Sequence, residues 1–298
     1  MTLRHLKIFV AVCDCLNMTT AAESLFMSQS AVSQTIAELE KHYASKLFER
    51  LSKKLYLTQA GHKLLSYARH ILRLNADMES DMTLLHQNGS IRIGASVTVG
   101  AYVLPKLVAK FLQAISSSTV EVVEDNTARI EKMILLDQID IGLVEGETTS
   151  PEMISRPFLG DELLLICGIH HRFANQSEID PQELEHENFI IREKGSGTRK
   201  TFEDTMTAHQ IAWKSVWTCS NTDTIKMAVS EGLGVSVMSR RAVANEVAQG
   251  ILKEISMSGI RFDRQFKLVY HKNKYFTEHM RHFTDSLFQT TEPIRNKN

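Results

Sequence analysis

The sequence contains few of the residues that usually signal redox, metal or membrane chemistry. It has only 4 cysteines, with no CxxC pair, and 12 histidines, with no HExxH or similar ligand spacing. Scattered cysteines of this kind are typical of reduced, buried thiols, and we expect neither a metal site nor a cofactor. No run of about 18 uncharged apolar residues occurs, so no membrane span and no membrane partner are expected.

The motifs of common catalytic sites are also absent. There is no GxSxG motif, and GSGT at 195–198 lacks the lysine of a phosphate-binding P-loop. Because no nucleophile or acid–base pair emerges, we expect that the protein is not an enzyme. The apolar N-terminal run is interrupted by Asp14 and lacks a small-residue cleavage site, so no secretory signal is predicted and we expect a cytoplasmic protein.

Charge is distributed unevenly along the 298 residues, a length that suggests two to three domains. Residues 1–76 hold 10 Lys and Arg against 5 Asp and Glu, whereas the rest of the chain holds 24 against 30. A basic N-terminal piece on an acidic body suggests a polyanionic partner for that piece.

Residues 19–42 predict two short helices joined by a tight turn. Asn17 and Thr19 can supply capping oxygens for the first helix, where Thr20 and Glu23 also match a capping box, and Ser28 can cap the second. In the second helix Val32, Ile36 and Leu39 form an apolar stripe, with polar side chains opposite. The segment LFERLSKKLYLTQAG then has the pattern of a two-stranded wing. This layout is that of a helix-turn-helix, but the residues alone leave a generic helical hairpin as an equal alternative.

Residues 62–88 predict a long helix without Pro or Gly before its end. Its apolar positions follow a 4-3 spacing over three heptads, as in a coiled-coil seam formed by Leu64, Ala68, Ile71, Asn75, Met78, Met82 and Leu85. Asn75 lies in the a register, where one buried Asn can set the register and the number of chains. The pattern favours a dimerising linker helix over a helix that packs on its own domain.

The remaining residues alternate strands and helices. Strands are predicted at 91–96, 119–125 and 139–146, with helices at about 101–112 and 128–136 between them, which indicates a parallel α/β sheet. Further strands are predicted at 163–168, 188–193, 215–220, 234–239 and 266–271.

Several predicted strand ends carry small or hydroxyl residues directly before a helix. These residues are Ser96, Thr98, Thr127, Gly195, Ser196, Gly197, Thr198, Asn221 and Thr222. Backbone N–H groups at helix starts bind anions, so four such starts that converge favour a small carboxylate or oxyanion. Each start taken alone is better explained as a capped helix than as an anion site, and Arg199 is either a ligand contact or a surface residue.

The N-terminal third carries a dense set of family motifs. L-x-x-F, AA-x-x-L-x-x-SQ-x-A-x-S, I-x-x-LE, LFxR and LTxAG occur at Leu6–Phe9, Ala21–Ser33, Ile36–Glu40, Leu47–Arg50 and Leu57–Gly61. With these motifs the chain resembles the LysR-type transcriptional regulators over essentially its whole length. It departs from them at Ser30, where many members have Pro, and at Asn17-Met18, where Gly-Ser-Phe is common.

The resemblance implies an α + α/β architecture in three parts. A winged helix-turn-helix would occupy residues 1–60, a dimerisation linker helix 61–89, and an effector module shaped like a periplasmic binding protein 90–298. Lobe I of this module would comprise about 90–160 and 267–298, and lobe II about 161–266, so the chain would cross between the lobes near 160 and 266.

The resemblance also implies partners and site residues. Double-stranded promoter DNA would meet Thr19, Gln29, Ser30, Ser33, Gln34, Arg50, Lys53 and Lys54, with the basic residues on the backbone or in the minor groove. The other implied partners are further copies of the chain, as a homodimer or homotetramer, and RNA polymerase.

A subgroup associated with sulfur assimilation is similar in the segments GASVTVGAYVLPKLVAKF, LVEGE, REKGSGTR and GLGVSVMSRRAV, which suggests a sulfur oxyanion or a related anion as effector. A free-standing solute-binding protein and a metabolic enzyme with a DNA-binding appendage are the alternatives. The predicted lack of a signal peptide and the basic helical piece disfavour the first, and the missing catalytic set disfavours the second.

Overall fold

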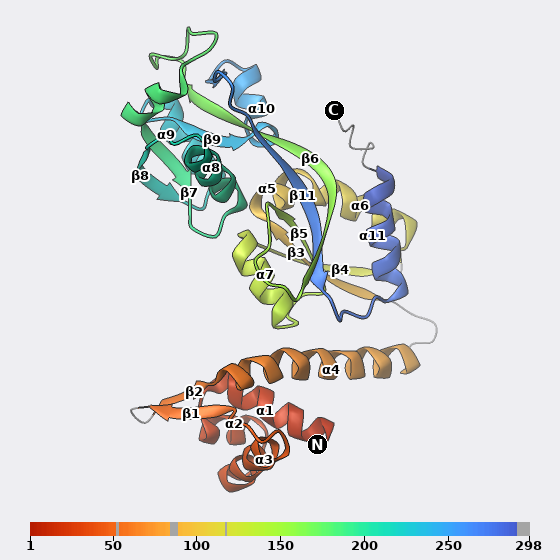
Figure 1. The fold of residues 1–298 in the computed structure, drawn as a ribbon. Helices are drawn as coiled ribbons and strands as arrows, with labels where there is room; N and C mark the ends of the chain where they lie inside the picture. Colours follow the sequence, from red (N-terminus) through yellow and green to blue (C-terminus); the bar gives the residue numbers. More distant parts are fainter. Residues whose placement is uncertain (52–53, 84–88, 117, 291–298) are drawn as a thin grey trace. The chain divides into compact units, whose positions relative to one another are not determined.

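The computed structural model describes residues 1–51, 54–83, 89–116 and 118–290 (Figure 1). Its contacts divide the chain into two compact units, Met1–Asn88 with Leu135–Gln138, and Gly89–Ile134 with Ile139–Asn298. Each unit is described separately. Across the described stretches no helix is both long enough and apolar enough to cross a bilayer.

The N-terminal unit consists of four helices and a small wing. Helices α1 (Leu3–Cys15), α2 (Met18–Ser24) and α3 (Gln29–His42) precede an antiparallel hairpin of β1 (Phe48–Leu51) and β2 (Lys54–Leu57), and α4 (Gln59–Thr83) follows. The apolar stripes of α1 and α3 face one core, where the rings of Phe9 and Phe48 lie 5.5 Å apart. Ala21 and Ala22 of α2 are buried in the same core, where their small side chains allow the helices to pack closely.

The two helix starts of the helix-turn-helix differ in how well the sequence predicted them. Ser28 caps α3 as expected, because its side chain accepts a hydrogen bond from the Ala31 N–H at 3.2 Å. Of the capping signals before α2, Asn17 was correct and the capping box at Thr20 and Glu23 was wrong. Helix α2 begins earlier, and its cap is Asn17, whose Oδ1 accepts from the N–H groups of Thr19 at 2.8 Å and Thr20 at 3.3 Å.

The C-terminal unit is built on a mixed seven-stranded sheet. Strands β5 (Ile141–Glu145), β3 (Ser90–Ser96) and β4 (Thr119–Asp125) pair in parallel. Two long strands, β6 (Met153–Gly168) and β11 (Phe262–His271), add to β5 in antiparallel fashion, with Gly160 opposite Gln265. Both strands run from one lobe into the other (Figure 1), so a single pair of strands carries the two chain crossings.

Lobe I contains four helices around the parallel strands: α5 (Val97–Tyr102), α6 (Leu104–Ala114), α7 (Thr127–Leu135) and α11 (Glu278–Thr290). The single helix expected at 101–112 was wrong, because two helices meet at Val103, which has φ −124° and ψ −54°. Pro105 explains the break, since it has no N–H to continue the hydrogen bonding of α5 into α6.

Lobe II is smaller. Its parallel strands β7 (Asn188–Arg192) and β8 (Lys214–Cys219) are accompanied by helices α8 (Gly197–Ala208), α9 (Thr222–Ser230) and α10 (Arg240–Ala248) and a 3-10 helix at Pro181–His186. Strands β9 (Ser236–Ser239) and β10 (Leu252–Ile255) pair with β6. The domain limits at 60, 89, 160 and 266 stay predictions.

Candidate DNA-binding surface and effector site

Helix α3 separates its apolar and polar residues cleanly. Val32, Ile36 and Leu39 are buried in the core of the N-terminal unit. The outer face presents the four side chains expected to read bases, which are all exposed: Gln29, Ser30, Ser33 and Gln34. These positions are one and four residues apart, so they share one face of the first half of the helix.

Short side-chain hydrogen bonds orient two of these residues. The hydroxyl oxygens of Ser28 and Ser30 lie 3.0 Å apart, and Gln34 donates from Nε2 to Oε1 of Glu38 at 3.1 Å. His5 of α1 lies 3.2 Å from the other oxygen of Glu38. The Gln34 amide is therefore held along the helix surface before DNA arrives.

The wing is attached to α3 by Glu40. Its Oε1 accepts from the N–H groups of Leu47 at 3.0 Å and Phe48 at 3.4 Å, and its Oε2 lies 2.6 Å from the Lys46 ammonium. Partial burial opposes ionisation, but these hydrogen bonds prevail and lower the pKa of Glu40 below its ordinary value. The ionised Glu40 of the LE motif thus fixes where the wing begins.

The basic candidates and Thr19 are exposed on three elements. Arg50 lies on β1, Lys54 on β2 and Thr19 on α2, while Lys53 lies outside the described residues. Leu51 and Lys54 are opposite each other in the hairpin, so Lys54 lies near the tip of the wing, where a phosphate can reach it.

The linker-helix positions fall into two groups. Ala68 is fully buried and Leu64 half-buried in the core of the N-terminal unit, whereas Ile71 and Met78 expose 40% and 55% of their surface. Asn75 donates to Glu79 at 2.8 Å. The side chain of Met82 and all of Leu85 lie outside the described residues. Of the predicted seam, the side chains exposed for contact with a second chain therefore begin at Ile71.

Three of the predicted effector residues, Thr127, Gly197 and Thr198, contact Glu145 at the end of β5, and a fourth, Gly195, is bonded to the residue after Thr127. Thr127 donates to the Glu145 carbonyl oxygen at 3.0 Å, and the Ala128 N–H donates to the carbonyl oxygen of Gly195 at 3.2 Å. A side chain at Gly197 would overlap the same Glu145 carbonyl oxygen. Thr198 makes a long hydrogen bond of 3.5 Å to Oε1 of Glu145. The start of α8 in lobe II therefore packs directly on lobe I.

The sequence did not point to Arg264, which holds this contact together. Its buried guanidinium lies 2.8 Å from Glu145 and 2.7 Å from Asp161, and its Nη1 donates to the Thr198 hydroxyl at 2.9 Å. Arg264 lies between Phe262 and Phe266 at inward-facing positions of β11. The only sign of this role in the sequence is that a charged residue stands between two apolar residues at alternating strand positions.

Ser96 and Thr98 lie at the carboxyl end of β3, at the same sheet edge as Glu145. Ala95 pairs with Leu143, which places Ser96 beside the last residues of β5. Ser96 is fully buried, and its hydroxyl has no hydrogen-bond partner among the described residues. Ser196 caps α8, and Arg199 pairs with Glu203 at 2.7 Å, which favours a structural role for Arg199.

Asn221 and Thr222 line a cavity of about 530 Å³, and none of the predicted residues named above is among its lining residues. Four carboxylates line this cavity: Glu124, Asp125, Glu193 and Asp223. Burial raises the pKa of Glu124 above its ordinary value, against the opposing charge of Arg192. The structure thus divides the predicted anion-binding residues into a hydroxyl-rich group around Glu145 and a carboxylate-lined cavity.

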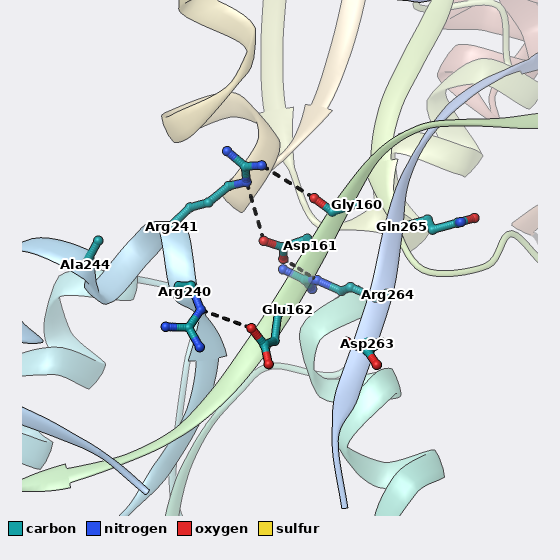
Figure 2. Close-up of a pocket in the computed structure, with 9 residues that line it drawn as sticks. All are labelled: Gly160, Asp161, Glu162, Arg240, Arg241, Ala244, Asp263, Arg264 and Gln265. Atoms are coloured by element: carbon teal, nitrogen blue, oxygen red, sulfur yellow. Dashed lines mark hydrogen bonds and ion pairs between the residues drawn. The ribbon is translucent and has the colours of Figure 1, made fainter. Parts of the chain in front are cut away.

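A second cavity, of about 880 Å³, lies where β6 and β11 cross between the lobes (Figure 2). Arg240 lies 3.0 Å from Glu162, and Arg241 lies 3.6 Å from Asp161 and donates to the Gly160 carbonyl oxygen at 3.4 Å. Since its arginines are matched by carboxylates, this cavity is not a free cationic site.

The thiols show no sign of reactivity. Burial raises the pKa of Cys167 to about 11 and moves that of Cys13 upward as well. Both thiols therefore stay protonated at neutral pH. Among residues with described side chains, no cluster of His, Cys, Asp and Glu is suited to a metal ion.

Taken together, a basic winged helix-turn-helix and a two-lobed ligand-binding fold define a DNA-binding transcriptional regulator with an effector-binding domain. Two family models match the chain, "Bacterial regulatory helix-turn-helix protein, lysR family" at residues 3–62 and "LysR substrate binding domain" at residues 86–292. The chain belongs to the LysR family of transcriptional regulators, and like its relatives it is a regulator and not an enzyme.

Known proteins resemble it along most of its length. The transcriptional regulator YeiE of Escherichia coli (strain K12) is 32% identical over 284 residues, which cover 95% of this chain and 96% of YeiE. CysL of Bacillus subtilis (strain 168) is 34% identical over 268 residues, 89% of each chain. The regulatory domain of Synechocystis PCC6803 CcmR, solved in complex with 2-PG, matches with a TM-score of 0.65 and 25% identity over 70% of this chain and 99% of that one.

Proposed function

We propose that this regulator binds a small anion, a sulfur oxyanion or a carboxylate, at the hydroxyl-rich group where α8 meets lobe I. The unpartnered hydroxyl of Ser96 carries the proposal, because a fully buried hydroxyl normally has a hydrogen-bond partner. The N-terminus of α8 lies at the same sheet edge and adds a favourable dipole. A small molecule, 2-PG, occupies the related CcmR domain.

The carboxylate-lined cavity is the less suitable place for an anion. No Lys or Arg is among the described residues that line it, and the cations Arg129, Arg192 and Lys226 near it are already paired with its carboxylates Asp125, Glu193 and Asp223. The proposed site therefore keeps Ser96, Thr98, Thr127 and the 195–198 segment. It assigns Asn221 and Thr222 no direct contact with the anion.

Calorimetric titration of the full chain tests this site. Sulfite, sulfate, thiosulfate and a set of small carboxylates are titrated into the parent protein, S96A and T222A. We expect at least one anion to bind the parent and T222A alike and S96A about tenfold more weakly, as one lost hydrogen bond to a charged group implies. Loss of binding in T222A but not in S96A would place the ligand in the carboxylate-lined cavity. If no compound of the panel bound, the proposal of an anionic effector would be wrong.

The regulatory mechanism that follows is a population shift. An anion that bridges Ser96 in lobe I and the 195–198 segment in lobe II stabilises the closed arrangement of the lobes. The anion can shift the equilibrium between the open and closed arrangements by no more than its differential affinity for them, and this limits its effect on DNA binding.

The proposed assembly is a homodimer or homotetramer formed in part through α4. Ile71, Leu74 and Met78 are exposed at spacings of three and four residues, so they form one apolar strip along the helix. Edge strands β4 and β8 also expose Val122 and Trp217. Sedimentation of I71E/M78E should show a shift toward monomer relative to the parent, and a matched E79K variant should sediment as the parent does. An unchanged mass for I71E/M78E would mean that α4 is not the seam.

DNA recognition is proposed to follow the division seen on α3 and the wing. Gln29, Ser30, Ser33 and Gln34 read base edges, while Arg50, Lys53 and Lys54 contact the sugar–phosphate backbone, and Thr19 supports the docking from α2. The regulator then acts in the cytoplasm on promoter DNA, and its binding there changes transcription by RNA polymerase, its second partner. In-vitro transcription from a bound promoter, with and without effector, tests this last step.

A further inference from the structure

Phe26 is placed where neither its backbone nor its side chain favours a phenylalanine. It lies in the turn between α2 and α3, and 99% of its surface is exposed, more than for any other large apolar residue whose side chain is described. Its φ of +53° is in the left-handed region, which glycine and asparagine adopt far more readily. The core does not explain this residue, because the ring lies outside it.

The local hydrogen bonds explain why the backbone must be left-handed at this position. The Phe26 N–H donates to the Glu23 carbonyl oxygen at 3.1 Å, and the Met27 N–H donates to the Ala22 carbonyl oxygen at 2.9 Å. This pair of bonds is the Schellman ending of a helix, and it puts the residue after the cap in the left-handed conformation, where glycine is usual. Phe26 therefore makes the turn less stable than glycine would.

The position of Phe26 relative to α3 suggests what the ring contributes. It lies two residues before the Ser28 cap and three before Gln29, so a chain of three residues, spanning at most about 10 Å, separates it from the first base-reading candidate. In a helix-turn-helix the N-terminal residues of the second helix enter the major groove. When these N-terminal residues of α3 enter the major groove, the exposed ring of Phe26 therefore also lies close to the groove.

We propose that Phe26 is a specificity-determining residue that packs against the C5-methyl group of a thymine in the major groove. The ring has no hydrogen-bond donor or acceptor, and the thymine methyl is the apolar group that major-groove edges offer. The ring then becomes buried when the protein binds its operator, which accounts for a residue that is unfavourable in the free protein.

The test begins with operator duplexes selected from random DNA by the full-length protein. Each thymine of the selected site is replaced by uracil, which removes only the methyl group. For the parent we expect one uracil position per half-site to weaken binding about fourfold, the effect of one buried methyl. F26G should bind the thymine duplex more weakly than the parent and should show no further loss with uracil. The denaturation midpoint of F26G should rise, because the left-handed turn favours glycine.

A44G is the matched control. Ala44 has φ +49° at the other end of α3, and the N–H groups of Ala44 and Ser45 make the same pair of hydrogen bonds, to Lys41 and Glu40. A44G should therefore stabilise the fold in the same way and leave operator affinity unchanged. Equal affinity of F26G and the parent for the operator would overturn the proposal. So would an equal uracil effect in both proteins, which would mean that the ring packs on sugar or elsewhere.

Discussion

Replacing Asp140 with Asn should destabilise the effector-binding domain, and the effect should depend on pH in a defined direction. The carboxylate is almost fully buried just before β5, where it accepts from the Arg92 N–H and Nη2, each at 2.8 Å, and lies 2.7 Å from the Lys274 ammonium. Burial disfavours the charge, but Arg92 and Lys274 outweigh it and lower the pKa of Asp140 from 3.8 to about 2.

The magnitude and the sign follow from this shift. A pKa lowered from 3.8 to about 2 stabilises the folded state by about 2 kcal/mol. Because the folded pKa is the lower one, this contribution is complete well above pH 3.8. It declines as the pH falls from 3.8 toward 2, and it is absent below that. D140N should therefore lose about 2 kcal/mol in unfolding free energy at pH 7, and the gap to the parent should narrow in acid.

Urea unfolding of the full chain measures this difference. Far-UV circular dichroism is combined with fluorescence of Trp213 and Trp217, the only tryptophans in the sequence, both in the C-terminal unit. D204N is the control, since solvent screens its exposed pair with Lys200, which should add little to stability. Equal stability of D140N and the parent at pH 7, or a gap that widens toward pH 3, would refute the reasoning.

Two further predictions concern the DNA contacts and the contact between the lobes. K54A should weaken binding to all duplexes alike and lower the salt slope by about one, because it removes a phosphate contact, whereas Q34A should change the selected sequence. Quantitative gel shifts over a range of salt, with site selection, measure both, and identical selected sites for Q34A and the parent would exclude Gln34 as a reader. R264M should lower the unfolding free energy by about 3–5 kcal/mol, because it leaves Glu145 buried without its cation and Asp161 with only the more distant Arg241. The triple variant R264M/E145Q/D161N should recover part of that loss in the same urea assay, and a triple variant no more stable than R264M would contradict this account.

Local sequence was sufficient for the recognition helix and for most strands. The stripe of Val32, Ile36 and Leu39 and the Ser28 cap are encoded within one segment of the chain, and the structure reproduces both. The strands at 188–193 and 234–239 were also predictable, because runs of β-branched and apolar residues mark buried strands. Local competition explains the two errors. Of the residues that could cap α2, Asn17 supplied the cap and the predicted box at Thr20 did not form, and Pro105 interrupts the stretch that periodicity predicted as one helix.

The effector site was only partly predictable. The hydroxyl and glycine residues after each strand were recognised as helix starts, but their spacing along the chain does not say which of them converge. The structure places Thr127 and the 195–198 segment around Glu145, whereas Asn221 lines a cavity to which none of those residues contributes. Ala68 likewise fits a heptad in the sequence, yet it is buried in the core of its own domain.

The sequence by itself determined the class of the protein, because the helix-turn-helix motifs and the alternation of strands and helices depend on neighbours a few residues away. Only the tertiary structure showed that Arg264 joins Asp161, 103 residues earlier in the chain, to Thr198 and Glu145. Such contacts depend on the register of β6 against β11 and on how the two lobes meet. Local patterns of residues predict neither the strand register nor the contact between the lobes.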